Sequence, residues 1–212
     1  KDTSSGNSAD IDAYQAIVYG SRSFASHPDV ELNWQTDIGI NKNQGRRNIS
    51  FMDRVAKADY DSYTAHVGTG AGKRFQLSDA TTLIPSIRAD YAYIKDESYT
   101  ETGAGALNLD VDSNHSDELI VMAQGNLGHQ LNDKATIKTN LGLGYDLLND
   151  ATSLTASYTG GGTAFTTQGI DPSPWLARAG IGMNFQTGDT SEITAQYDIE
   201  GRQDFLSQTA SI

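Results

Sequence analysis

The sequence has no cysteine, few prolines and no long apolar run. Its 212 residues include no cysteine, as expected of a protein in a compartment where a free thiol is a liability, such as a bacterial envelope. Four prolines beside 21 glycines and 10 tyrosines form a β-type composition with few breaks. No run approaches the roughly 18 apolar residues of a membrane-spanning helix. Membrane strands are still compatible with the sequence, because they carry their hydrophobicity in alternation.

Basic residues are also scarce. The 15 lysines and arginines stand against 27 aspartates and glutamates, and the net charge of −12 argues against a nucleic-acid surface. The sequence opens on the polar tract KDTSSGNSAD and shows no signal peptide. If the protein is exported, we therefore expect this chain to be processed or partial.

Alternation of apolar and polar residues with a period of two runs through most of the chain. In KATIKTNLGLGYDLL (134–148), Leu141, Leu143 and Tyr145 fall on one side, because successive side chains of a strand point to opposite faces. Glycines and β-branched residues at this period favour strands over helices throughout. The pattern predicts nine strands, over 12–24, 30–41, 60–75, 81–96, 118–131, 134–148, 175–186, 192–202 and 205–212.

The connections between these strands alternate in length. Short segments cover 25–29, 76–80, 132–133 and 187–190, whereas longer polar segments cover 43–59, 97–115 and 149–173, with a shorter one at 200–204. This asymmetry is typical of an outer-membrane barrel, which has tight turns in the periplasm and long loops outside. Such barrels have an even number of strands and both termini in the periplasm, so one or three strands are expected before residue 1.

The two faces of the strands favour lipid over a protein core. Aromatic residues on the apolar faces lie towards the strand ends, as in the girdle of a membrane barrel. The predicted lipid-facing and girdle residues are Trp34, Tyr91, Tyr93, Leu141, Leu143, Tyr145, Trp175, Phe185 and Tyr197. Small, polar and oppositely charged residues on the other faces suit a hydrated lumen, where curvature crowds the side chains. The predicted lumen-lining residues are Asp37, Gly68, Gly70, Arg88, Asp90, Gln124, Asn126, Lys138, Asn140, Gly142, Gly144, Asp146, Arg178, Gly180, Gly182, Gln196, Asp198, Glu200 and Arg202.

Four stretches carry a family resemblance. They are TTLIPSIRADYAYIKDESYTETGAGALNLDVDS (81–113), LGLGYDLLND (141–150), LTASYTGGGTAFTTQGIDPSPWLARAGIGMNF (154–185) and EITAQYDIEGRQDFLSQTASI (192–212). Together they resemble the autotransporter β-domain, the translocator of type V secretion. The resemblance rests on a long ordered series of moderately specific pieces and covers nearly the whole chain from about residue 11.

The resemblance implies an all-β, antiparallel, twelve-stranded barrel in the bacterial outer membrane. It implies several partners: outer-membrane lipid and lipopolysaccharide, an upstream passenger domain, a linker helix in the lumen, and the barrel-assembly machinery. The chain departs from the family pattern because it stops at Ile212 rather than on an aromatic residue, and because the linker helix and first strands are missing. Residues 1–212 are therefore expected to be one barrel domain, incomplete at both ends.

Two motifs partly match known binding loops, one for phosphate and one for calcium, but each lacks a residue that the loop requires. VGTGAGKR (67–74) would need glycine at Val67 and serine or threonine at Arg74 to form a phosphate-binding loop. DVDSNHSDE (110–118) begins like a calcium loop, but His115 stands where the turn requires glycine. The four histidines have no metal-ligand spacing. We therefore expect neither a cofactor nor an enzymatic activity.

The charged residues predicted to line the lumen allow two interpretations of their role. Arg88, Lys138, Arg178 and Arg202 either pair with the inward acidic residues and fill a hydrated barrel, or some of them hold the linker helix and plug the pore. The leading functional hypothesis is a translocator and anchor for the protein's own passenger. The alternatives are a porin-like channel and a soluble secreted β-sandwich or adhesin module.

Overall fold

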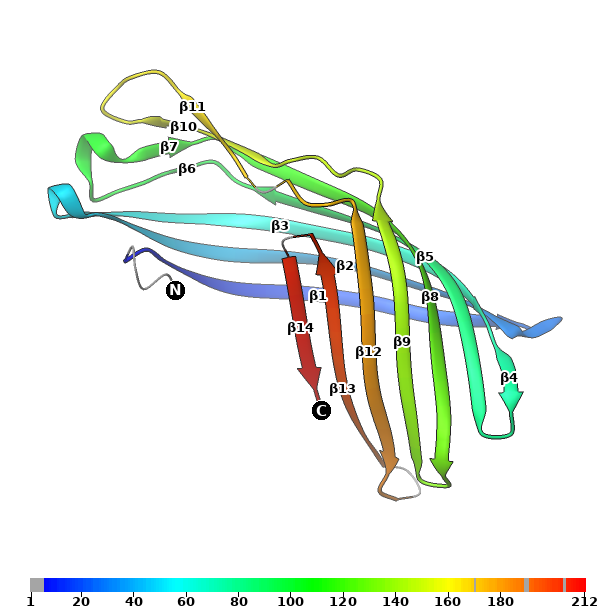
Figure 1. Ribbon diagram of the computed structural model, residues 1–212. Coiled ribbons are helices and arrows are strands. Elements are labelled where there is room, and N and C mark those ends of the chain that lie inside the picture. The colour runs from blue at the N-terminus through cyan, green and yellow to red at the C-terminus, as the bar shows by residue number, and fades with distance from the viewer. Residues whose placement is uncertain (1–5, 170, 189–190, 204) are drawn as a thin grey trace.

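The computed structural model describes residues 6–169, 171–188, 191–203 and 205–212 (Figure 1). The strands are β1 (Ser8–Phe24), β2 (His27–Ile49), β3 (Arg54–Lys73), β4 (Phe75–Ser78), β5 (Thr81–Asp96), β6 (Tyr99–Thr100), β7 (Leu109–Val111), β8 (Asn114–Asn132), β9 (Ala135–Asp146), β10 (Ser153–Tyr158), β11 (Phe165–Gln168), β12 (Trp175–Gln186), β13 (Glu192–Arg202) and β14 (Phe205–Ser211). Within the described ranges the helical segments are two three-residue 3-10 helices, η1 (Ser50–Met52) and η2 (Gly105–Leu107). No helix there is long and apolar enough to cross a membrane.

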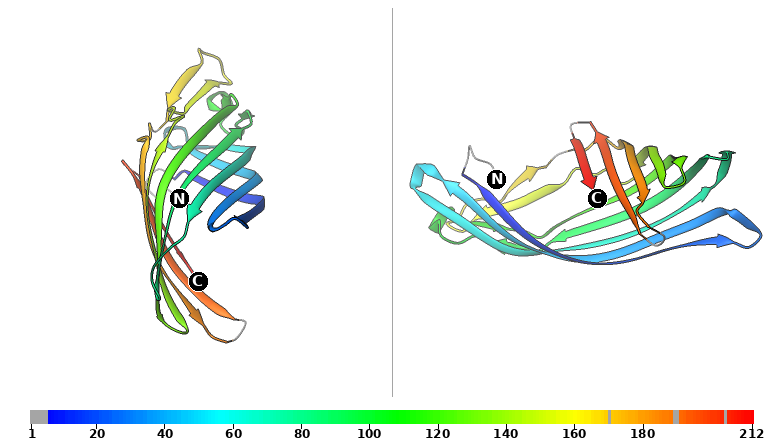
Figure 2. Two further views of the ribbon diagram at one scale, coloured as in Figure 1. Left: turned by 90° about the vertical axis from the view of Figure 1, so that its right-hand side faces the viewer. Right: turned by 90° about the horizontal axis from the view of Figure 1, so that it is seen from below.

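One antiparallel sheet of ten strands dominates the molecule. Its strand order is β1–β2–β3–β5–β8–β9–β12–β13–β14, and β4 pairs with β5. The sheet curls into an open trough with β1 and β14 at its two margins (Figure 2). Each of the nine predicted strands corresponds to one strand of this path, and the prediction of an antiparallel all-β fold is confirmed.

A second, smaller sheet lies within the two longest predicted loops. Strands β6 and β7 come from 97–115, β10 and β11 come from 149–173, and the order is β11–β10–β7–β6. An isolated β-bridge between Lys57 of β3 and Thr102 connects the segment after β6 to the main sheet. The second sheet lies at the same end of the trough as η1 (Figure 1).

The prediction of a long polar loop at 43–59 is wrong. Strand β2 has 23 residues and runs to Ile49, η1 makes the turn, and β3 begins at Arg54. A membrane strand needs only about 9–11 residues, so this hairpin is much longer than a bilayer requires. The predicted connections 149–173, 187–190 and 200–204 each include residues that lie outside the described ranges.

Large apolar side chains on one face of the main sheet are uncovered. Leu141 is 69% exposed and Leu143 is 55% exposed. The hydrophobic cluster of the described residues is small and lies where η2 packs against the end of the β2–β3 hairpin; its members are Ile49, Ala56 and Ala104, with Leu107 partly buried against them. A β-sandwich needs a second sheet about 10 Å away on the apolar face. The described chain has no such layer, which argues against the soluble-sandwich alternative.

Candidate functional site

The strand registers separate the predicted lumen-lining residues from the predicted lipid-facing residues. All 19 predicted lumen-lining residues, from Asp37 on β2 to Arg202 on β13, lie on one face of the main sheet. All nine predicted lipid-facing residues, from Trp34 to Tyr197, lie on the opposite face. That the first face lines a lumen and the second contacts lipid stays a prediction.

The polar face is the concave face of the trough. Asn33 on β2 accepts a hydrogen bond of 2.7 Å from Arg88 on β5, although β3 lies between the two strands. Asn140 on β9 donates one of 3.1 Å to Asp198 on β13 across β12. Backbones of strands separated by a third strand are roughly 9–10 Å apart. Such contacts therefore form on the side towards which the sheet curls.

Glycine on the intervening strand makes room for these contacts. Gly180 of β12 is the register partner of Asn140 on one side and of Asp198 on the other. A Cβ at Gly180 would lie 2.1 Å from Asp198 Oδ1 and 2.4 Å from Asn140 Nδ2. Gly70 of β3 has the same position beneath the contact between β2 and β5. The inward glycines thus accommodate side chains that meet from the flanking strands.

A charged cluster links β2, β3 and β5 on the concave face. His66 Nδ1 lies 2.8 Å from Asp37 Oδ2, and His66 Nε2 lies 3.0 Å from Asp90 Oδ1. Arg88 Nε donates to the two Asp90 oxygens at 2.9 and 2.8 Å. Two glutamine side chains also donate to Asp37, which is buried. Hydrogen bonds to ionised groups are about twice as strong as neutral ones, so this cluster ties three strands together.

A second charged cluster lies on β9, β12 and β13. Arg178 Nε donates to Glu200 Oε2 of the neighbouring strand. Gln196 Nε2 donates to Asp198 Oδ2 at 2.6 Å, in addition to the contact from β9 described above. These groups line a cavity of about 540 Å³ on the concave face.

A third cluster joins β13 to β8 and β9 near the end that carries the long loops. Arg202 Nη1 lies 3.0 Å from Glu118 Oε1 and 3.7 Å from Asp146 Oδ2. Asp146 is 2% exposed, and its Oδ1 accepts hydrogen bonds of 3.1 Å from the backbone N–H groups of Leu119 and Leu148. Arg88, Arg178 and Arg202 thus each form an ion pair with a carboxylate within the sheet.

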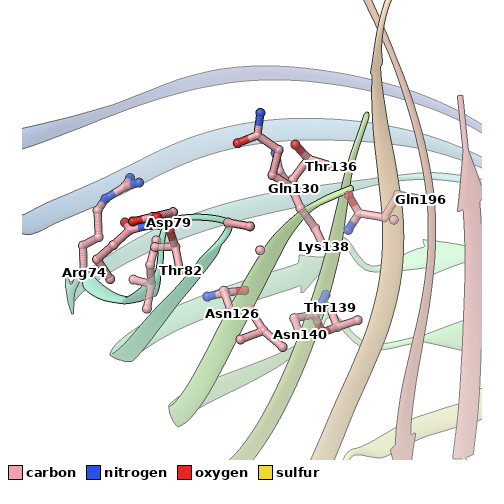
Figure 3. Close-up of a pocket in the computed structure, with 16 residues that line it drawn as sticks. Arg74, Asp79, Thr82, Asn126, Gln130, Thr136, Lys138, Thr139, Asn140 and Gln196 are labelled. Atoms are coloured by element: carbon pink, nitrogen blue, oxygen red, sulfur yellow. Dashed lines mark hydrogen bonds between the residues drawn. The ribbon is translucent and has the colours of Figure 1, made fainter. Parts of the chain in front are cut away.

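Lys138 of β9 differs from the other inward cations in the body of the sheet. Among the described residues, no carboxylate forms an ion pair with its ammonium group. Its register partners are Gly128 on β8 and Gly182 on β12. It lines a cavity of about 530 Å³ (Figure 3).

The segment after β6 is held against the end of the β2–β3 hairpin. Arg47 donates to the Glu101 carboxylate at 3.0 and 2.6 Å, and these hydrogen bonds raise the pKa of Arg47. Tyr99 stacks on Tyr60 with 4.4 Å between ring centroids, and burial raises the pKa of the Tyr99 phenol. Sequence reasoning missed these contacts because it placed all four residues in or beside loops.

Comparison with known proteins identifies the family. The family model of the autotransporter β-domain matches residues 2–198. The chain belongs to the autotransporter β-domain family. Among solved structures, the translocator domain of the autotransporter NalP from Neisseria meningitidis is similar, with a TM-score of 0.72 and 19% sequence identity over 96% of this chain. The chain spans 65% of that domain's length. No curated protein sequence matches it.

Family membership gives the location and the secretion system. Autotransporter β-domains are outer-membrane barrels of type V secretion, and the family is not an enzyme family. The resemblance found in the sequence and the outer-membrane location are therefore confirmed.

Most residues of the two motifs weighed for other chemistry lie in strands of this autotransporter β-domain. Asp110 of β7 accepts a hydrogen bond of 2.9 Å from Thr100 of β6, which is an ordinary contact between strands. Gly68, in the glycine-rich stretch, lies beneath the charged cluster, where a Cβ would be 2.0 Å from Asp90 Oδ1. In the described ranges, no group of three or more histidine, aspartate or glutamate side chains is arranged to hold a metal ion.

Several residues of the concave face were not singled out from the sequence. They are Gln15, Asn33, His66 and Glu118, and each takes part in one of the charged clusters. The signal that could have found them is strand parity, that is, whether a residue lies an even or an odd number of positions along the strand from a residue of known face. His66, for example, shares its face with Gly68 and Gly70, two residues and four residues further along β3.

Gly180→Ala is expected to destabilise the β-domain by about 1–3 kcal/mol, a typical effect of overpacking. The added Cβ would force apart Asp198 and Asn140 and break the hydrogen bond between them. Gly128→Ala is the matched control, because a Cβ at Gly128 of the same face meets nothing within 4 Å. Urea unfolding in detergent micelles measures both variants. Equal midpoints for the two would contradict the packing role of Gly180.

Proposed function

We propose that this β-domain anchors its protein in the outer membrane and provides the route by which its own N-terminal passenger reaches the cell surface. The observation that supports this is the division of the main sheet between a concave face of linked polar side chains and an uncovered apolar convex face. In this proposal the concave face lines a hydrated lumen, and the convex face contacts lipid and lipopolysaccharide.

The proposal includes a closed barrel of twelve strands, of which residues 1–212 supply nine. Strands β1 and β14 each have one pairing partner in the described chain, and lipid does not tolerate unpaired backbone groups. Three further strands between β1 and β14 would pair both edges. The barrel-assembly machinery would insert the domain, and the linker helix would lie against the concave face.

The proposed role is mechanical rather than enzymatic. The charged side chains of the concave face engage one another across strands, an arrangement that shapes and stiffens a wall. The domain would thus act through its shape and charge, with no covalent step and no nucleotide.

Surface labelling in intact cells tests this function. An epitope placed upstream of residue 1 in the full-length gene product is expected to bind antibody on unpermeabilised cells, because the barrel delivers the passenger outside. A version without residues 1–212 is the control, and its epitope is expected to react only after permeabilisation. An epitope that stays inside while the purified domain conducts ions would refute the translocator role and support the porin-like alternative.

A further inference from the structure

Strand β11 is the outer edge of the second sheet. The order of that sheet is β11–β10–β7–β6, so β10 is the one strand that pairs with β11 in the described chain. All four residues of β11 are exposed. Figure 1 shows β11 at the end of the trough that carries the long loops. The second sheet therefore presents an open edge at that end.

The hydrogen bonds between β10 and β11 identify which backbone groups of this edge are unused. In an antiparallel pair, residues that exchange both hydrogen bonds with their partner alternate with residues that exchange none. The Gly169 N–H donates to the Thr152 carbonyl at 2.8 Å, in the register that the β10–β11 ladder continues. Counting back from Gly169 in steps of two, Thr167 bonds to β10, whereas the N–H and C=O groups of Thr166 and Gln168 point away from it. Such groups are a template for one more strand.

The edge lacks the features that usually protect an edge strand. Natural edge strands are blunted by charged side chains, by proline or by a β-bulge. The sequence of β11 is FTTQ, with neither charge nor proline, and its four register pairs with β10 run without a shift. Phenylalanine and threonine also favour the extended conformation. Strand β11 is thus suited to accept a further strand.

The two faces of the sheet at β11 define the chemistry of such a strand. Phe165 lies against Tyr158 with 5.6 Å between ring centroids, and Ala156, the register partner of Phe165, lies on the same face. On the other face, Thr166 Oγ1 lies 3.1 Å from Thr155 Oγ1. Aromatic residues pair well with apolar ones across strands, and hydroxyl groups pair with one another. The added strand is therefore expected to place an apolar residue beside Phe165 and a small polar residue beside Thr166.

We propose that β11 pairs with an extended segment of the protein's own passenger after that segment has reached the cell surface. The inference rests on the proposed function, which places the end with the long loops outside the cell. In this mode of recognition, main-chain hydrogen bonds supply the affinity and alternate side chains supply the specificity. A four-residue ladder is too short to hold a dilute partner. The passenger belongs to the same chain and leaves the barrel at this end, so its effective concentration at β11 far exceeds that of a second copy of the domain.

Photocrosslinking of the full-length protein in intact cells tests the pairing. Thr167 is replaced by p-benzoylphenylalanine, because this position lies between its register partner Leu154 and the proposed strand. We expect a crosslinked peptide that joins position 167 to the passenger upstream of residue 1. Thr166→Pro should lower the yield of this product about tenfold, because it removes an N–H that the β10 ladder does not use. Thr166→Val is the matched control, since it keeps the N–H and a β-branched side chain and should leave the yield unchanged.

Two further measurements show that the loss comes from the edge itself. The same probe at Thr155, the register partner of Thr166, should crosslink to β11 in both variants if β10 and β11 still pair. Gln168→Pro removes the second outward N–H and should reduce the passenger product as Thr166→Pro does.

Three results would overturn the proposal. A product that joins two copies of residues 1–212 would assign the edge to a second copy of the domain. Products confined to β10 would show that the edge stays unpaired. Equal passenger yields from Thr166→Pro and Thr166→Val would show a contact without strand pairing. Antibody labelling of the passenger on the same cells separates this inference from the proposed function: a labelled passenger without the crosslink overturns the inference alone, whereas an unlabelled passenger overturns the proposed function.

Discussion

Leu141→Arg is expected to block assembly of the domain in the outer membrane. Leu141 lies on the convex face of β9, is 69% exposed, and is flanked in register by Gly125 and Ala179. Small neighbours cannot shield an arginine from the acyl chains. An arginine on the lipid face at the bilayer midplane costs about 2–4 kcal/mol, a large part of the stability of most folded domains. The unheated sample should lose its fast-migrating folded band on a gel, and the variant should leave the outer-membrane fraction.

Gln124→Arg is the matched control for this experiment. Gln124 lies on the concave face of β8, opposite Gly142, which is the chain neighbour of Leu141. The same charge at a similar position along the strand then faces the proposed lumen, where water and polar groups solvate it. Normal folding of Gln124→Arg beside failure of Leu141→Arg supports lipid contact on the convex face. Equal assembly of both variants would contradict that assignment.

The side-chain faces were predictable because a strand has a strict period of two. Leu141 and Gly142 are neighbours in the chain, and any extended conformation places them on opposite faces. Wherever lipid or a lumen imposes a distinct composition on each face, parity alone therefore assigns the residues. This is why one alternating stretch such as β9 could be placed correctly without knowledge of its partners.

The hairpin formed by the ends of β2 and β3 was missed for the complementary reason. Arg46 and Arg47 are adjacent, so one points outward and the other inward, and the two faces carry similar side chains. Polar and apolar residues alternate along a strand only where its two faces contact different surroundings. This alternation is lost where both faces are polar, although the backbone remains a regular ladder from Arg46–Lys57 to Ile49–Arg54.

The contacts within the concave face could not be predicted, because they depend on register and curl. Parity places Lys138 and Arg178 on the same face, but it does not tell that Arg178 meets Glu200 while Lys138 lies between two glycines. That distinction requires the alignment of three strands to within one residue. Long-range register is set by the sum of many small side-chain preferences, and a single strand does not contain it.

Arg202→Met is expected to reduce stability by about 3–5 kcal/mol, the usual cost of breaking a buried ion pair by removing one partner. The Arg202 side chain is 8% exposed and the Asp146 side chain is 1% exposed. Without the guanidinium, the Asp146 carboxylate keeps its backbone donors but loses its countercharge. Glu118, which is 42% exposed, can turn to water and contributes little to the loss.

Arg178→Met is the matched control for this second prediction, because the pair of Arg178 with Glu200 has side-chain exposures of 48% and 24%. Solvent screens such a pair, and its removal should cost about 0–1 kcal/mol. Urea unfolding in lipid vesicles, followed by tryptophan fluorescence, compares the two variants. Asp146→Asn added to Arg202→Met should recover part of the loss, since it removes the uncompensated charge. Equal destabilisation by Arg202→Met and Arg178→Met, or no recovery in the double variant, would show that burial of Asp146 does not set the strength of this cluster.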